Sequence, residues 1–196
     1  MNSLLVLVLV VSATPDVAAQ VKERLDTGAV VHGRFEQQKQ VKGFKRPLVS
    51  TGDFVVARGH GVRWHTASPF DSVLTVRPDD IRSTQGGAEV FSLSASKEPT
   101  VRVINQVLFA LLAGDVEVLR THFEVKGTID AKAWHLELTP KAKALEKVLA
   151  RIALEGDGFV RSLELTEGSG DVTRIRVDEP SSAQALSAEE QAGFSK

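Results

Sequence analysis

The residues best suited to acid–base or metal chemistry are the histidines, and their spacing does not favour a shared site. The chain contains His32, His60, His65, His122 and His135. His60 and His65 are five residues apart, which on a strand puts their side chains on opposite faces and argues against joint ligation of a metal. His135 alternates with Trp134 and Leu136, so its ring should face solvent.

Nucleophilic and nucleotide chemistry lack their usual sequence patterns. The chain has no cysteine and no GxSxG, GxxxxGK[ST], GxGxxG or HExxH segment. Asp79 and Asp80 follow Pro78, which is typical of a turn and not of a catalytic pair. We therefore expect a protein that is not an enzyme and needs no cofactor or metal. Histidine and carboxylate side chains converging inside a cavity would overturn that expectation.

The composition narrows the class of protein. The chain has 196 residues, 42% of them hydrophobic, which suits one globular domain with a sizeable core. Its 24 Lys and Arg residues stand against 25 Asp and Glu residues, for a net charge of −1. Nucleic acid is a poor candidate partner, because no basic excess is available to neutralise phosphates.

Residues 1–19 are typical of a secretory signal peptide. Residues 4–11 form an uninterrupted run of eight aliphatic side chains, too short to span a bilayer, and Val17-Ala18-Ala19 offers a cleavage site. We predict export to the periplasm; the alternative is a buried N-terminal strand in a cytoplasmic protein. Gln20 stands where a lipoprotein needs cysteine, so the exported chain should be soluble and not lipid-anchored.

Residues 47–78 predict three consecutive antiparallel strands, with turns at residues 59–61 and 68–71. Each strand has two apolar residues that share a face; these pairs are Phe54 and Val56, Val62 and Trp64, and Leu74 and Val76. The other face carries polar residues. A sheet with one apolar face must cover that face with another layer.

The covering layer is predicted at residues 101–112. Val101, Ile104, Leu108 and Leu111 recur at helical spacing, and Gly114 ends the helix. The helix is either an ordinary core element or a lid over a lipid cavity. After it, short alternating strands return, interrupted by a short helix after Pro140 in which Ala144, Leu145 and Val148 should share a face. No linker is evident, so we expect a single domain over residues 20–180 and a tail over residues 181–196 that ends in a short helix.

Five motifs, in order, resemble the LolA-like family of periplasmic outer-membrane lipoprotein carriers. They are Gly33-Arg34-Phe35-Glu36-Gln37; Gly52-Asp53-Phe54 with Arg58, Val62-Arg63-Trp64 and Pro69; Leu111-Leu112-Ala113-Gly114-Asp115 with Phe123; Trp134-His135-Leu136-Glu137-Leu138-Thr139-Pro140-Lys141; and Gly170-Asp171 with Thr173-Arg174-Ile175. The resemblance covers residues 21–177. It implies the α+β class: a single-domain curved antiparallel β-sheet, an incomplete barrel, with helices covering its concave hydrophobic face.

The resemblance also implies a function. Such a carrier binds the acyl chains of lipoproteins, receives them from an inner-membrane ABC transporter and passes them to an outer-membrane receptor lipoprotein, as a monomer. Two departures leave the cargo open: Gly59 follows Arg58 where the family usually has proline, and residues 78–93 lack tryptophan and tyrosine. The alternative cargo is a non-protein amphiphile such as a lipid, a glycolipid or an acylated pigment. A third possibility is an interaction module with a filled core.

Strand and helix spacing then predicts the residues of the ligand site. The cavity should be lined by Phe54, Val56, Val62, Trp64, Leu74, Val76, Ile104, Leu108 and Leu111. Arg58 is the candidate latch, since its guanidinium could donate hydrogen bonds to carbonyls of the lid helix. The alternative for Arg58 is an ordinary solvated strand residue.

Overall fold

The computed structural model describes residues 16–26, 28–94, 96–97 and 100–195, without the side chains of residues 100–104 and 108. In this part of the chain, eleven strands form one sheet in the order β6-β5-β4-β3-β2-β1-β11-β10-β9-β8-β7. The strands are β1 (Val30–Gln40), β2 (Leu48–Ala57), β3 (Gly61–Ser68), β4 (Ser72–Arg77), β5 (Asp80–Gln85), β6 (Ala88–Ser94), β7 (Phe123–Asp130), β8 (Ala133–Pro140), β9 (Leu149–Gly156), β10 (Val160–Glu167) and β11 (Val172–Ala183). All neighbours are antiparallel, and the sheet stays open between its edge strands β6 and β7.

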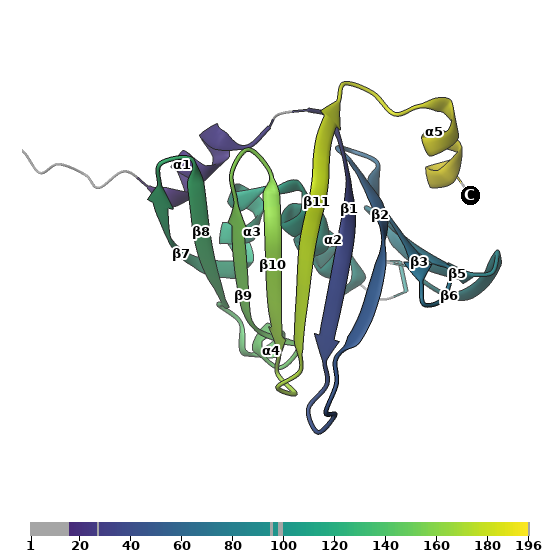
Figure 1. Cartoon of the computed structure of the whole chain (residues 1–196), viewed down its shortest axis with the longest axis horizontal. Coiled ribbons are helices and arrows are strands. Elements are labelled where there is room, and N and C mark those ends of the chain that lie inside the picture. The colour runs from purple at the N-terminus through teal and green to yellow at the C-terminus, as the bar shows by residue number, and fades with distance from the viewer. Residues whose placement is uncertain (1–15, 27, 95, 98–99, 196) are drawn as a thin grey trace, which may run out of the picture.

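Helices lie on both faces of this sheet. They are α1 (Val17–Arg24), α2 (Thr100–Ala113), α3 (Val116–His122), α4 (Lys143–Glu146) and α5 (Ala188–Ser195). Helices α1, α2 and α3 lie behind the sheet in the view of Figure 1, where they cover one face. Their buried residues join the main core with one side of nearly every strand. The predicted α+β fold with a helix-covered sheet is thus confirmed.

Alternation along the strands decides which face is which. In β8, Trp134, Leu136 and Leu138 are buried in the main core, whereas His135 and Glu137 are partly exposed on the other face. The predicted pairs also share their faces: Phe54 is opposite Trp64, and Val56 is opposite Val62. Trp64 and Val62 are in turn opposite Leu74 and Val76. This follows from the period of two along a strand.

Two glycines make room for aromatic rings on the covered face. Gly33 is opposite Phe54, and Gly52 is opposite Phe35. A Cβ atom on Gly33 would lie 2.7 Å from the ring of Phe54, and one on Gly52 would lie 3.0 Å from the ring of Phe35. Each ring therefore occupies the space above the facing glycine. At Gly52 the carbonyl oxygen of His65 is closer still, 1.8 Å from such a Cβ atom, so both contacts require glycine there.

Helices lie near both ends of the described chain. Helix α1 begins at Val17, three residues before Gln20. The Asp16 carboxylate accepts a hydrogen bond from the backbone N–H of Ala18, which caps the helix. Strand β11 continues through residue 180 to Ala183. Helix α5 packs against the outer face of the sheet, where Phe194 and Leu186 form a second small core with Val55. The C-terminal residues are therefore part of the fold.

Two helical predictions were incomplete. Helix α3 was not anticipated, although Asp115 caps it and Leu119 is buried. The expected helical face shared by Ala144, Leu145 and Val148 does not form: α4 has only four residues, and Val148 lies beyond it and is 61% exposed. A single helical turn is too short to carry an apolar stripe as far as Val148. None of the described helices is long and apolar enough to cross a bilayer.

Candidate ligand-binding cavity

An apolar cavity of about 190 Å³ lies between α2 and the covered face of the sheet. Strands β3 and β4 supply one wall, α2 a second, and β10, β11 and β1 the third. The lining residues are Gln37, Val62, Trp64, Leu74, Val76, Leu111, Leu112, Leu163, Leu165, Thr173 and Ile175. None of these side chains is titratable, and only Gln37 and Thr173 are polar. Such a lining suits a hydrocarbon chain and offers no acid, base or nucleophile.

The structure brings several of the predicted site residues together around this cavity. Val62, Trp64, Leu74, Val76 and Leu111 all line it. Their role in binding stays a prediction.

The remaining predicted site residues lie elsewhere. Phe54 borders a separate hollow of about 20 Å³ beside Leu112 and Ile175. Val56 is buried in the main core and lines none of the described hollows. Ile104 and Leu108 fall on α2, but their side chains are outside the described part of the chain.

Trp64 is fixed by aromatic neighbours at the edge of the cavity. Its ring stacks on Phe35 with the ring centroids 3.9 Å apart, and on Phe54 with the centroids 5.5 Å apart. The rings of Phe35 and Phe54 are the ones for which Gly52 and Gly33 make room. These stacking contacts stabilise the position of the Trp64 ring in the cavity wall.

A second apolar hollow, also of about 190 Å³, lies toward the β4–β5 turn. It is lined by Gly59, Gly61, Val76, Arg77, Pro78, Asn105, Gln106 and Phe109. Val76 borders both hollows, and both lie against α2. Each is smaller than the roughly 300–1,000 Å³ that small-molecule pockets usually offer. A shift of α2 would enlarge both, because the helix forms a wall of each.

Asn105 fastens α2 to the sheet. Its side chain is only 3% exposed, and its Nδ2 donates hydrogen bonds to the carbonyl oxygens of Arg77, at 2.7 Å, and Asp80, at 3.2 Å. The Asn105 Oδ1 atom is buried without a hydrogen-bond partner among the described residues. Sequence reasoning missed this contact, although a lone amide in an apolar helix was a visible signal. Asn105 therefore connects the helix that covers the cavity to the β4–β5 turn.

The family described as "Outer membrane lipoprotein carrier protein LolA" matches residues 27–190. The chain belongs to this family. The family description is that of a carrier and not of an enzyme. The match takes in every strand of the sheet, the cavity and Asn105.

One curated relative is the outer-membrane lipoprotein carrier protein of Halorhodospira halophila. It is 28% identical over 130 residues, which cover 66% of this chain and 58% of the relative. The match thus spans less than two thirds of the relative's length.

Similar solved structures include a DUF1329 family protein from Desulfovibrio piger, with a TM-score of 0.47 and 11% identity over 87% of this chain and 92% of the other. A LolA superfamily protein from Nitrosomonas europaea has a TM-score of 0.45 and 10% identity over 88% and 94%.

Within this LolA fold, Arg58 lies in the turn between β2 and β3. Its backbone N–H donates to the carbonyl of Ala29 at 2.9 Å, and its side chain is exposed. Among the described residues, the Arg58 guanidinium has no hydrogen-bond partner. Its function as a latch stays a prediction. The described bond between helix and sheet runs the other way, from an amide on α2 to carbonyls of the sheet.

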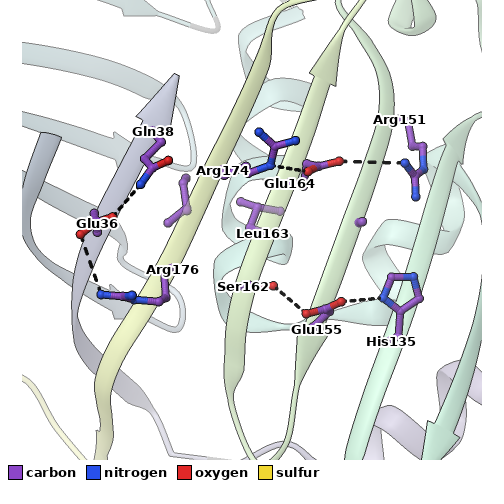
Figure 2. A pocket seen from close by; sticks show the side chains of 12 residues that line it. Glu36, Gln38, His135, Arg151, Glu155, Ser162, Leu163, Glu164, Arg174 and Arg176 are labelled. Carbon is purple, nitrogen blue, oxygen red and sulfur yellow. Dashed lines mark hydrogen bonds and ion pairs between the residues drawn. The ribbon is translucent and has the colours of Figure 1, made fainter. Parts of the chain in front are cut away.

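The outer face of this LolA sheet is polar and holds a wide hollow of about 470 Å³. Figure 2 shows its ion pairs crossing β11, β10, β9 and β8. The Arg174 Nε atom is 2.7 Å from Glu164, and the His135 Nδ1 atom is 3.3 Å from Glu155. These charges are paired with one another along a wide, open surface. Among the described residues, no group of three His, Asp or Glu side chains could hold a metal ion.

His65 lies between two carboxylates on the outer face. Its Nε2 atom is 2.8 Å from Asp71, and its Nδ1 atom is 2.8 Å from Asp53. The hydrogen bond to Asp71, followed by the one to Asp53, raises the pKa of His65 above its ordinary value. These groups connect β2, β3 and the β3–β4 turn on the face away from the cavity. They can stabilise the hairpins but cannot reach a ligand in the cavity.

Proposed function

We propose that this chain is a carrier that binds the acyl chains of lipoproteins under α2 and moves them from the inner to the outer membrane. The observation that carries the proposal is the apolar cavity between α2 and the sheet, whose described lining residues include no titratable side chain. Membership of a family of lipoprotein carriers supports the same function. Among the described residues that line this cavity there is no His or carboxylate side chain to act as an acid or base.

Binding would be driven by burial of hydrocarbon. Each methylene group removed from water contributes about 0.8 kcal/mol, so one acyl chain can be held firmly without any polar contact. The closed cavity of about 190 Å³ is too small for a long chain. Cargo must therefore displace α2, and the two hydrogen bonds of Asn105 oppose that displacement. A carrier needs this balance, because a closed state that is too stable would exclude cargo.

The place of action follows from the same proposal. Export through the predicted signal peptide would put the carrier in the periplasm, between a donor and an acceptor membrane. The donor would be an inner-membrane ABC transporter, and the acceptor an outer-membrane receptor lipoprotein. The chain would travel between them as a soluble monomer.

A non-protein amphiphile is the second candidate cargo. The small volume of the closed cavity favours it, since one chain of a lipid or glycolipid needs less room than the several chains of a lipoprotein. Both candidates use the same walls and the same movement of α2.

Mass spectrometry under native conditions, on protein recovered from its own cell envelope, tests the proposal. A co-purifying acylated protein or lipid is expected, and its mass would decide between the two cargoes. Trp64 provides a second measurement. With Trp134 replaced by phenylalanine, the Trp64 emission should change when a long-chain fatty acid is added. The proposal would be contradicted if the Trp64 emission of cargo-free protein stayed unchanged at a saturating concentration of fatty acid.

A further inference from the structure

The loop that joins β1 to β2 projects from one end of the sheet and is basic and apolar together. In Figure 1 it extends beyond the other loops at this end. It contains Lys42, Lys45 and Arg46 and no acidic residue between residues 41 and 49. Phe44 is 64% exposed and Leu48 is 61% exposed. We call these five residues the basic tip. Neither Lys45 nor Arg46 has an ion-pair partner among the described residues.

The basic tip is held in one conformation. The Gln40 side chain donates to the carbonyl oxygen of Phe44 at 2.7 Å and to that of Val41 at 3.3 Å. The Phe44 N–H donates to the carbonyl of Val41 at 3.0 Å. Gly43, with a φ of +91°, allows the reversal between them. The loop thus fixes the Phe44 ring outward instead of folding it against the sheet.

Two neighbouring loops extend the same surface. The Lys42 N–H donates to the Asp171 carboxylate in the β10–β11 turn at 2.9 Å, and the Gly168 N–H of that turn donates to the carbonyl of Val148 at 3.3 Å. Val148 is itself 61% exposed. Near it, Lys141, Lys143 and Lys147 stand against Glu146 alone in residues 141–148. Two acidic residues at the β10–β11 turn offset part of this charge: Asp171, and Glu167, which is paired with Lys39 at 2.7 Å. This end of the sheet still combines exposed apolar side chains with a positive excess, although the whole chain has a net charge of −1.

We propose that this end of the sheet docks on an anionic phospholipid bilayer. Phe44, Leu48 and Val148 would enter the interface, and the surrounding Lys and Arg side chains would lie among the phosphates. The charge complementarity and the outward apolar residues favour a bilayer over a protein partner, whose interface would be depleted in lysine.

The position of the cavity gives such docking a purpose, and this part rests on the proposed function. Gln37 and Thr173 line the cavity. Thr173 is paired with Lys39, which lies near the end of β1, just before the β1–β2 loop. Gln37 is four residues before Val41, which corresponds to about 13 Å of strand. A bilayer at the basic tip would thus be close to the cavity, where an acyl chain could pass between lipid and protein.

The test is binding to vesicles of phosphatidylglycerol mixed with phosphatidylcholine, compared with pure phosphatidylcholine. The variant replaces Lys42, Lys45 and Arg46 by glutamine. Each basic residue is worth about fivefold in partitioning, so the triple variant should lose on the order of a hundredfold. Binding should also weaken between about 0.1 M and about 1 M salt. The matched control removes the same charge at Lys22, Lys126 and Lys132, exposed residues of α1, β7 and the β7–β8 turn.

A tryptophan at the tip reports the contact directly. Brominated phosphatidylglycerol should quench the emission of Phe44→Trp but not that of Val90→Trp, which lies on the edge strand β6 with 60% exposure. All variants are compared in the same full chain, so the apolar residues 4–11 contribute equally to each.

Equal loss of vesicle binding in both triple variants, or equal quenching at both tryptophans, would overturn the proposal. The proposal would also be overturned if the unaltered protein bound no vesicles while the triple variant transferred cargo less well. The basic tip would then contact a protein partner. Uptake of a fluorescent fatty acid without vesicles tests the cavity separately. Failure of that uptake would count against the carrier function, whatever the tip does.

Discussion

Replacing Asn105 by alanine should loosen α2 without unfolding the protein. The variant removes the hydrogen bonds to the carbonyl oxygens of Arg77 and Asp80. Two such bonds contribute about 1–3 kcal/mol together. The substitution also removes the buried Oδ1 atom, which has no partner among the described residues, and this relief lowers the cost. We expect a loss of about 1–2 kcal/mol, or a factor of roughly 5–30 in the closed-to-open ratio.

Two measurements separate the helix from the whole fold. Urea unfolding, followed by tryptophan fluorescence, gives the free energy of unfolding. The rate of uptake of a fluorescent fatty acid reports access to the cavity. This rate should rise by the same factor by which the closed-to-open ratio falls. Gln106→Ala is the matched control: Gln106 is the next amide on α2 and is exposed, and although it borders the second hollow, no hydrogen bond joins its side chain to the sheet among the described residues. An Asn105→Ala variant that is less stable but takes up fatty acid no faster would show that Asn105 is only a packing residue.

Three further predictions concern other parts of the molecule. Arg58→Leu should leave the unfolding free energy almost unchanged, since the Arg58 side chain is exposed. If Arg58 is a latch, the transfer of cargo to an acceptor should fall about tenfold in this variant. An equal effect of Arg63→Leu on this transfer would refute the latch. His65 has a raised pKa in the folded protein, so the stability that it contributes is complete below about pH 6.5 and is lost as the pH rises through the higher folded pKa. Urea unfolding measured across this pH range should show the loss. A His65→Gln variant with the same pH dependence would show that His65 is not its cause. Gly52→Ala should destabilise the protein strongly in thermal unfolding, because its Cβ would lie 1.8 Å from the carbonyl oxygen of His65; an unchanged melting temperature would refute this.

Local patterns in the sequence predicted the elements well. Alternation with a period of two placed Phe54, Trp64 and Leu74 on one face before any pairing was known, and the structure puts them on the covered face. Gly114 ends α2 with a φ of +65°, as expected of glycine at a helix end. Such features depend only on the backbone geometry of a few consecutive residues, so the sequence carries them directly.

The family motifs carried information that spacing alone did not. Gly33 and Gly52 were visible as parts of motifs, but the reason for them appears only across strands, where each faces the ring of Phe54 or Phe35. In the same way, Asn105 was an ordinary polar residue of an apolar helix until the fold placed it against the β4–β5 turn. A side chain's partner in another element cannot be predicted from its own neighbours in sequence.

The sequence by itself therefore determined most of the strands, the covering helix α2 and the face on which the apolar residues of β2, β3 and β4 lie. Only the tertiary structure decided that β1 pairs with β11, that Val62 and Leu165 border one cavity, and that the basic tip lies beside the β10–β11 turn. The physical reason is the range of the interactions. Steric limits and hydrophobic period act over a few residues, whereas the pairing of distant strands depends on how the whole chain buries its apolar surface at once.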